Sequence, residues 1–531
     1  MTLRDVDLND KYLAGSGRIY LTGTQALVRL PIEQKRRDRL AGLNTAGLIS
    51  GYRGSPVGVY DQELWKVKRV LADHEITFQP GLNEDLAATA LWGAQQVGVF
   101  GEAKYDGVFG IWYGKNPGFD RSGDAIKHAN FAGTSPNGGV LAVIGDDHGA
   151  KSSTIPNQSD FGLMNHFMPT LFPSDVQDVL DFGHYGLELS RFSGCWVGFK
   201  VEPHIMDRSQ TVEVDPSRAR TVRPADFAMP ERGGSLRWPD NRFDQEARMV
   251  DLKLPAVHAF VRANPFINRV VLAPSKPRIG IVTAGKSYLD VREALAELGI
   301  GPETAERLGV SLLKVGMTWP LEPGAIRSFC SGLDEVVVVE EKQPVLENQI
   351  RALLYDLPER LRPRIVGKSD ERGMPLLSAK GELDAVEIAT MFAGRLRAIA
   401  PDAQIESRLT ALTERRIKVP EPAPIVRKPY FCSGCPHSTS VRHPEGSRAS
   451  GGIGCHWMAV WTPQFATEPS TQMGGEGAHW IGQAPFVTDA HIFQNLGDGT
   501  YYHSGTAAIR AAVAAGVNIT YKLLYNDAVA M

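Results

Sequence analysis

The apolar and polar positions of the first two hundred residues alternate between two periods. Four short apolar runs predict strands: 45–49, 107–113, 140–144 and 196–201. Four segments between them have the helical period: 64–71, 86–99, 125–131 and 174–189. Consecutive apolar positions are typical of strands buried on both faces, and Ser174 is the expected N-cap of the last helix. Strands that alternate with helices favour a parallel sheet covered on both sides.

The same alternation returns later in the chain. Residues 216–275 are rich in Arg, Pro and Asp, and carry one expected helix at about 245–264. A second set of strands is expected at 278–282, 311–315 and 336–340. Helices are expected at 288–298, 323–329, 345–355 and 383–399. Proline at every second position of 419–424 then predicts a stiff linker between domains.

These patterns predict an α/β fold of several doubly wound, mostly parallel-sheet domains. The expected segments are an α/β domain at 15–215, an irregular connection at 216–275, a second α/β domain at 276–360, a helix and Pro-rich linker at 361–428, and a third α/β domain at 429–531. The third domain has only two or three strands before residue 531. Because such a sheet would expose an unpaired edge, we expect the domain to be truncated and the chain to be part of a longer polypeptide.

Composition narrows the class of protein. A net charge of −3 over 531 residues gives no electrostatic reason to expect nucleic acid. No apolar window is long enough for a membrane span, and the N-terminus lacks a secretory apolar stretch, so a cytoplasmic protein is expected. Five cysteines are too few for a secreted disulfide framework, and Cys195 and Cys330 lie in apolar segments that predict buried thiols. The basic run 35–39 is expected to be a solvated helix face.

The last forty residues hold a candidate metal site. Gly497 and Gly499 allow a sharp turn that approaches an anion closely, on either side of Asp498. Asn526 follows an apolar strand, so a helix–strand unit would bring its oxygen near Asp498, and both suit Mg²⁺ on a diphosphate. A lone Gly-Asp-Gly is usually a turn, but this spacing is similar to the thiamine diphosphate motif. Nearby, Gly474 and Gly475 form either a plain loop or a second diphosphate contact.

Three of the cysteines cluster in the same region. Cys432 and Cys435 form a Cys-x-x-Cys turn followed by His437, and Cys455 comes next in the chain, with His456 directly after it. Three interpretations remain open: an iron–sulfur cluster whose fourth ligand lies elsewhere, a zinc site completed by one of the two histidines, or a redox-active dithiol.

Glu84 opens the Ala-rich helix at 86–99. An acidic residue at a helix N-terminus is explained by the helix dipole alone. A functional interpretation also exists, because thiamine diphosphate requires a carboxylate against N1′ of its aminopyrimidine. Glu84 suits that role if the first domain docks on the third.

Taken together, these stretches resemble the 2-oxoacid:ferredoxin oxidoreductases, most closely indolepyruvate ferredoxin oxidoreductases in their long single-chain bacterial form. The similar segments occur in the family's order: 50–56, 82–87, 145–153, 432–437, 452–455, 497–505 and 526–531. The resemblance implies a pyrimidine-binding domain at 15–215, a transketolase-C-terminal-like domain at 276–360 and a diphosphate-binding domain at 429–531.

The resemblance also assigns roles to residues. Glu84 would activate the cofactor, and Asp498, Asn526 and the backbone carbonyl of Ala528 would hold Mg²⁺. Further contacts to the cofactor are expected from Gly497, Gly499, Gly474, Gly475 and His437. Cys432, Cys435 and Cys455 would ligate a 4Fe–4S cluster.

The function implied by the resemblance is oxidative decarboxylation of a 2-oxoacid, with an aryl pyruvate such as indolepyruvate favoured. Coenzyme A would take the acyl group, and electrons would pass through iron–sulfur to ferredoxin. A homodimer that binds neither nucleic acid nor membrane is expected. The alternatives are a non-oxidative thiamine-diphosphate-dependent decarboxylase or ligase, and an inactive truncated chain.

Overall fold

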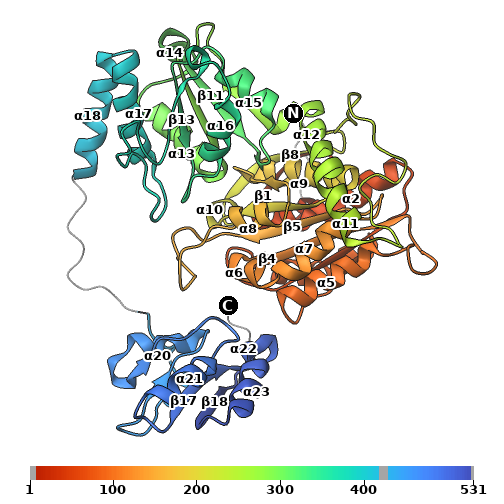
Figure 1. The fold of residues 1–531 in the computed structure, drawn as a ribbon, viewed down its shortest axis with the longest axis vertical. Helices are drawn as coiled ribbons and strands as arrows, with labels where there is room; N and C mark the ends of the chain where they lie inside the picture. Colours follow the sequence, from red (N-terminus) through yellow and green to blue (C-terminus); the bar gives the residue numbers. More distant parts are fainter. Residues whose placement is uncertain (1–6, 418–428, 528–531) are drawn as a thin grey trace. The chain divides into compact units, whose positions relative to one another are not determined.

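The computed structural model describes residues 7–417 and 429–527, which fall into two compact units (Figure 1). The larger unit lies within residues 1–419 and the smaller within residues 420–531. The expected linker at 419–424 and Ala528 lie outside the described residues.

A seven-stranded sheet, in the order β12-β6-β7-β5-β4-β2-β3, forms the centre of the larger unit. Its strands are β2 (Thr45–Gly51), β3 (Ile76–Phe78), β4 (Gly107–Lys115), β5 (Val140–Gly145), β6 (Thr170–Leu171), β7 (Trp196–Val201) and β12 (Met317–Trp319). Every neighbouring pair is parallel except β12 with β6. The carboxyl ends of β2, β4, β5 and β7 therefore share one edge of the sheet.

Helices cover both faces of this sheet (Figure 1). They are α1 (Asp10–Leu13), α2 (Gly23–Leu40), α3 (Tyr60–Lys66), α4 (Lys68–Ala72), α5 (Glu84–Gln95), α6 (Asn116–Arg121), α7 (Gly123–Ala132), α8 (Asp160–Asn165), α9 (Val176–Ser193) and α10 (Pro203–Met206). Strand β5 shows the division, because its side chains alternate between two cores. Leu141 and Val143 pack with residues of α2 and α9, whereas Ala142 and Ile144 pack with residues of α5 and α7.

A second sheet of five strands completes the larger unit, in the order β14-β13-β10-β11-β9. Its strands are β9 (Asn268–Leu272), β10 (Ile279–Ala284), β11 (Val310–Val315), β13 (Glu335–Val339) and β14 (Arg364–Val366). Only β9 is antiparallel to its neighbour. The helices around it are α13 (Gly285–Glu297), α14 (Pro302–Leu308), α15 (Pro323–Cys330), α16 (Leu346–Leu354), α17 (Ala385–Ile399) and α18 (Ala403–Ile417).

The smaller unit holds a four-stranded sheet whose strands are all parallel, in the order β16-β15-β17-β18. Its strands are β15 (Ala449–Ser450), β16 (Thr467–Glu468), β17 (Ile492–Gly497) and β18 (Ile519–Leu524). Its helices are α19 (His437–Ser440), α20 (Met458–Trp461), α21 (Ala478–Gln483), α22 (Asp498–Thr500) and α23 (Thr506–Ala515). The α/β prediction with mainly parallel sheets is confirmed.

Two features could not be seen from local pattern. An antiparallel ribbon joins β1 (Gly17–Thr22) to β8 (Ser209–Val214), two segments almost two hundred residues apart. The expected helix at 245–264 is α11 (Arg242–Arg248) followed by a π-helical turn and α12 (Leu254–Ala263).

The predicted N-cap Ser174 is wrong, since the carboxylate of Asp175 accepts the Asp178 N–H at 2.9 Å and caps α9.

The basic run in α2 is partly buried, contrary to the expectation of a solvated face. Lys35 is 1% exposed and donates to the carbonyl of Thr45, while Asp38 is 2% exposed and pairs with Arg191. The run faces α9 and the start of β2, so Lys35 meets a carbonyl ten residues further on and Asp38 meets an arginine 153 residues further on. Cys195 and Cys330 are buried, as predicted.

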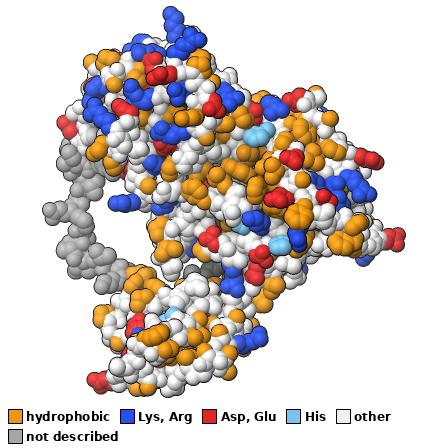
Figure 2. Space-filling view, viewed as in Figure 1, with side chains coloured by type: hydrophobic (Ala, Val, Ile, Leu, Met, Phe, Trp, Pro, Cys, Tyr) orange, Lys and Arg blue, Asp and Glu red, His pale blue; other side chains and the backbone are white. Residues whose placement is uncertain are grey.

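The outer surface carries interspersed basic and acidic side chains among apolar ones, as Figure 2 shows for one face. No helix in the described residues is both long enough and apolar enough to cross a membrane.

Candidate functional site

Three parallel strands of the smaller unit end at the same edge of its sheet. Strands β15 and β17 pair through Ser450 and Gln494, and β17 pairs with β18 up to Gly497 and Leu524. The turns that follow these strands therefore lie side by side. Ligands of open parallel sheets bind outside such carboxyl ends.

Asp498 links the ends of β17 and β18. One of its carboxylate oxygens accepts the backbone N–H of Asn526 at 3.1 Å and that of Asp527 at 2.8 Å, and the other accepts the Gly499 N–H at 2.9 Å. Asp498 is 6% exposed, whereas Asn526 lies at the surface. The helix–strand unit thus brings the two expected metal ligands together at the strand ends.

The imidazole of His456 lies between the glycine turns after β15 and β17. A Cβ on Gly452 would lie 2.7 Å from its Nε2, one on Gly454 2.9 Å from its Cε1, and one on Gly497 3.0 Å from its Cε1. His456 is 5% exposed, and burial lowers its pKa to about 4. Nε2 of His456 has no hydrogen-bond partner among the described residues.

Hydrogen bonds to the side chain of Glu476 link the turn at 472–477 to the loop after β15. The Glu476 carboxylate accepts the N–H of Gly474 at 2.7 Å and that of Ile453 at 3.2 Å, and its side chain is almost wholly buried. Burial raises the pKa of Glu476. Gly474 has a φ of +91°, a conformation that favours glycine, and Gly475 packs against the Gln472 side chain.

The three clustered cysteines are not assembled into a ligand set. Cys432 and Cys455 are exposed and Cys435 is half-buried, and the Cys435 N–H donates to the Cys432 carbonyl at 3.0 Å. Over residues 7–417 and 429–527, no group of three or more His, Cys, Asp or Glu side chains could hold a metal ion. His437 is 7% exposed, and its Nδ1 lies 3.1 Å from the Ser440 hydroxyl.

Glu84, the expected activating carboxylate, lies in the larger unit at the start of α5. The Asn83 side chain caps the helix by accepting the Leu86 N–H at 3.1 Å, and the indole N–H of Trp112 donates to the Glu84 carbonyl at 3.0 Å. Its side chain is 6% exposed and packs on α6, where a Cβ on Gly118 would lie 2.2 Å from Glu84 Oε1. The carboxylate is therefore held at the carboxyl edge of the seven-stranded sheet.

The turn after β2 adds polar groups to the same edge. Burial, and then the nearby Glu84 carboxylate, raise the pKa of Tyr52. Nε of Arg53 lies 3.4 Å from the buried carboxylate of Asp61. Arg53 is partly exposed, so its guanidinium offers a cation on the turn after β2.

A buried charge cluster lies at the ends of β5 and β7. His148 Nδ1 is 3.1 Å from Glu202, and its Nε2 is 3.5 Å from Asp146. Burial alone would lower the pKa of His148, but the two carboxylates raise it to about 10. Lys200 lies 3.4 Å from Asp146 and also pairs with Asp160, and it helps to lower the pKa of Asp146 to about 2.

Comparison with known proteins finds one matching family model and several relatives. Residues 269–418 match the family described as the indolepyruvate oxidoreductase domain. Indolepyruvate oxidoreductase subunit IorA of Methanothermobacter marburgensis is 26% identical over 538 residues, covering 99% of this chain and 78% of that protein. The same subunit of Pyrococcus horikoshii is 25% identical over 97% of this chain and 75% of its own. The chain is similar over almost its whole length to indolepyruvate oxidoreductase subunits. The resemblance drawn from the motifs is confirmed.

The fold of this indolepyruvate oxidoreductase relative is shared with a solved enzyme. The 2-oxoglutarate:ferredoxin oxidoreductase from Magnetococcus marinus matches 71% of this chain and 65% of that one, with a TM-score of 0.50 and 17% identity. At this identity the likeness concerns the fold alone.

Two residues of the candidate site, His456 and Glu476, were not expected from the sequence. His456 was considered only as a zinc ligand, and Glu476 was not considered. The glycines directly before Cys455-His456, at 451, 452 and 454, were an available signal, because closely spaced glycines often mark a tight contact. What contacts them is set by β17, forty residues later.

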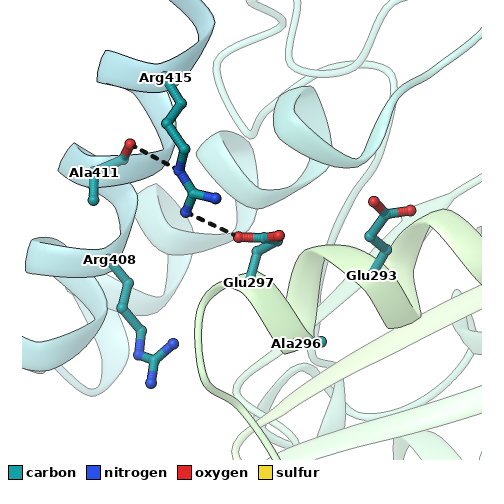
Figure 3. A pocket seen from close by; sticks show the side chains of 6 residues that line it. All are labelled: Glu293, Ala296, Glu297, Arg408, Ala411 and Arg415. Atoms are coloured by element: carbon teal, nitrogen blue, oxygen red, sulfur yellow. Dashed lines mark hydrogen bonds and ion pairs between the residues drawn. The ribbon is translucent and has the colours of Figure 1, made fainter.

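An open groove of about 410 Å³ lies between α13 and α18 of the larger unit (Figure 3). Glu293, Ala296 and Glu297 line one side, and Arg408, Ala411 and Arg415 line the other. Arg415 is paired with Glu297 at 3.3 Å, and none of the motif residues takes part. The groove is therefore described as a surface feature and is given no role in the site.

Proposed function

We propose that this chain binds thiamine diphosphate with Mg²⁺ in its smaller unit and takes part in the oxidative decarboxylation of a 2-oxoacid. The observation that carries the proposal is the joining of Asp498 to Asn526 across the ends of β17 and β18. Similarity to the two named relatives supports it, since both are indolepyruvate oxidoreductase subunits.

The residues present fit the cofactor and its metal. Asp498 and Asn526 supply hard oxygen atoms, and a backbone carbonyl at Ala528, outside the described residues, is the third proposed ligand. Turns containing Gly497 and Gly499 leave the backbone open to a diphosphate. Gly474 and Gly475 lie on the loop bound to the neighbouring turn through Glu476, so we assign them to the same site.

When bound, thiamine diphosphate supplies a carbon nucleophile and an electron sink for decarboxylation. The chain's own contribution is a carboxylate, Glu84, that would hold a proton at N1′ of the aminopyrimidine. Its burial against Gly118 keeps water away from that proton, and the Asn83 cap fixes the helix that carries it. His437 remains a further proposed contact to the cofactor.

The substrate and partners follow from the relatives' names and the motif resemblance. An aryl pyruvate such as indolepyruvate is proposed as the 2-oxoacid, with coenzyme A as acyl acceptor and ferredoxin as electron acceptor. A homodimer in the cytoplasm is proposed as the working form. Arg53, on the turn after β2, is proposed as a partner for the carboxylate that every 2-oxoacid carries.

A 4Fe–4S cluster on Cys432, Cys435 and Cys455 belongs to the proposal as the electron route. The described residues do not gather these thiols into a ligand set, so no electron path is derived from their positions. The second candidate is a non-oxidative thiamine-diphosphate-dependent decarboxylase or ligase, which needs no cluster.

Calorimetric titration with thiamine diphosphate and Mg²⁺ tests the proposed cofactor. The wild-type chain should bind, and Asp498→Asn should bind roughly 100-fold or more weakly, because a charged metal ligand is lost. Asp489→Asn is the matched control, an exposed aspartate of the same unit paired with Arg448 at 3.0 Å. A wild-type chain that does not bind, or Asp498→Asn that binds equally, would overturn the proposal.

An anaerobic dye assay then separates the two candidate reactions. Oxidative decarboxylation predicts that indolepyruvate and coenzyme A together reduce a viologen dye. Release of CO₂ without dye reduction, after reconstitution with iron and sulfide, would favour the non-oxidative enzyme.

A further inference from the structure

The ring of His456 lies at the carboxyl ends of the strands of the smaller unit, where Asp498 also lies. Gly452 follows β15 and Gly497 ends β17, and the two strands are hydrogen-bonded neighbours. The imidazole contacts both turns, so it lies between the ends of the two strands. Asp498 is the next residue after Gly497.

The glycines around this ring have no room for side chains. A Cβ at Gly452, Gly454 or Gly497 would come within 2.7–3.0 Å of a ring atom. Gly454 also has a φ of +140°, which favours glycine on its own account. Any larger residue at these positions would displace the ring from the strand ends, so the glycines and the histidine form one arrangement.

His456 is only 5% exposed, and its Nε2 atom is buried. This atom has no hydrogen-bond partner in the described part of the chain. Buried polar atoms in native proteins are nearly always hydrogen-bonded, to protein, water or ligand. Among the described residues of the smaller unit, Nε2 of His437 and Nδ1 of His479 are also buried without a partner, whereas two other histidines are hydrogen-bonded. His443 contacts the Ser447 hydroxyl and the Phe465 carbonyl, both at 2.9 Å, and His491 contacts the Thr520 hydroxyl at 2.8 Å.

We infer that Nε2 of His456 donates a hydrogen bond to a diphosphate oxygen of the cofactor, between the glycine turns and beside Asp498. An imidazole N–H and an anionic oxygen form a charge-assisted hydrogen bond, and the surrounding glycines let the backbone approach the same anion. The inference rests on the proposed function, because it takes thiamine diphosphate as the ligand. It adds a binding residue that makes no contact with the metal and touches the anion alone.

Substitution of His456 separates a ligand contact from a packing role. His456→Phe keeps a ring of similar size against the glycines and removes both nitrogens, and His456→Asn keeps a short side chain with a donor. His491→Phe is the matched control, since His491 precedes β17 and lies at the opposite edge of the sheet. Each protein is titrated with thiamine diphosphate, with inorganic pyrophosphate and with thiamine, all in the presence of Mg²⁺, and its melting temperature is recorded without ligand.

His456→Phe should weaken both thiamine diphosphate and pyrophosphate by roughly 10- to 100-fold, as expected for one hydrogen bond to a charged group. His491→Phe should bind like the wild type. The unliganded melting temperature of His456→Phe should stay within a few degrees of wild type, and the ligand-induced rise should shrink.

Three outcomes would overturn the assignment. If His456→Phe binds both anions as tightly as wild type, the assignment of His456 fails while the proposed function stands. If it weakens thiamine and thiamine diphosphate but leaves pyrophosphate binding unchanged, His456 does not contact the diphosphate. If the wild-type chain binds none of the diphosphates, the proposed function fails, and this inference with it.

A measurement on the unaltered chain covers the case in which the variants do not fold. With ¹⁵N-labelled histidine, addition of Mg²⁺ and pyrophosphate should shift the Nε2 resonance of His456 and leave that of His491 in place. An unchanged His456 resonance at saturating pyrophosphate would overturn the assignment.

Discussion

Two buried carboxylates carry the proposed chemistry, Glu84 in the larger unit and Asp498 in the smaller one. Glu84 and Asp498 are both 6% exposed, and each is fixed by neighbours far away in the sequence. Asp498 accepts backbone N–H groups from the end of the next strand, whereas Glu84 packs against Gly118 of α6. Burial keeps both carboxylates in one position, which a metal ligand and a proton-holding group each require.

Glu84→Gln tests the role of the carboxylate. The variant should bind thiamine diphosphate within a few-fold of wild type, yet lose roughly 10²- to 10⁴-fold in 2-oxoacid-dependent turnover, the usual share of a general acid–base group. Asp85→Asn is the control, because Asp85 is the next residue, is partly exposed and lies 3.6 Å from Arg121. Equal turnover in Glu84→Gln and wild type would contradict the assignment.

His148 gives the chain a pH-dependent contribution to stability. The carboxylates of Glu202 and Asp146 raise its folded pKa from 6.5 to about 10. A raised pKa contributes stability that is complete below about pH 6.5 and is lost as pH rises through about 10. His148→Asn should therefore lower the free energy of unfolding by about 3–5 kcal/mol near neutral pH, with the difference narrowing at high pH.

Urea unfolding at several pH values measures this difference. His128→Asn is the control, an exposed histidine 3.4 Å from Asp124 whose pair should contribute little. A constant difference between His148→Asn and wild type from pH 6.5 to 10 would show that His148 does not titrate in this window.

At the scale of elements, the predicted bounds of helices and strands can be compared with the observed ones. Strand β7 was expected at 196–201 and has those bounds, and α17 extends from Ala385 to Ile399 within the expected 383–399. The N-terminus of α9 was misplaced, because Ser174 and Asp175 are both common N-caps and only the backbone geometry selects one. The Ser174 hydroxyl has no hydrogen-bond partner among the described residues.

Substituting the two candidate caps of α9 distinguishes them. Asp175→Ala should lower the free energy of unfolding by about 0.5–2 kcal/mol, the usual contribution of an N-cap. Ser174→Ala should change it by less than about 0.5 kcal/mol, since no hydrogen bond of its hydroxyl is lost. Chemical denaturation of both variants decides, and a larger effect at Ser174 would contradict the assigned cap.

At the scale of the whole molecule, the five cysteines divide by exposure. Cys195 and Cys330 are buried in the larger unit, while Cys432 and Cys455 are exposed in the smaller one. Strand β12 follows β11 of the second sheet in the sequence but belongs to the first sheet, where Met317 pairs with Leu171. The larger unit therefore has a core shared by two sheets, and its two thiols lie inside that core.

Thiol labelling tests both the fold and the cluster proposal. In metal-free protein, an alkylating reagent should modify Cys432 and Cys455 quickly, Cys435 more slowly, and Cys195 and Cys330 only when the chain unfolds. After anaerobic reconstitution with iron and sulfide, the three cysteines of the smaller unit should become protected and the protein should turn brown. Peptide mass spectrometry reads the labelling. Continued modification of all three after reconstitution would contradict an iron–sulfur cluster.

The sequence by itself determined the alternation of strands and helices, the α/β class and the motifs at Glu84, Cys432 and Asp498. These features are local, since apolar period and turn residues report burial and backbone conformation within a few positions. The resemblance to indolepyruvate oxidoreductases could also be drawn from the motifs, because their residue types and order are distinctive.

Only the tertiary structure decided which distant residues meet. Four contacts join residues between ten and two hundred positions apart. They are the pairing of β1 with β8, the pairing of β12 with β6, the burial of Lys35 against Thr45, and the packing of His456 on Gly497. Their energies depend on the packing of whole sheets and helices, which local pattern does not report. The glycines beside His456 are visible in the sequence. The end of β17, which packs on the same ring, is brought there only by the fold.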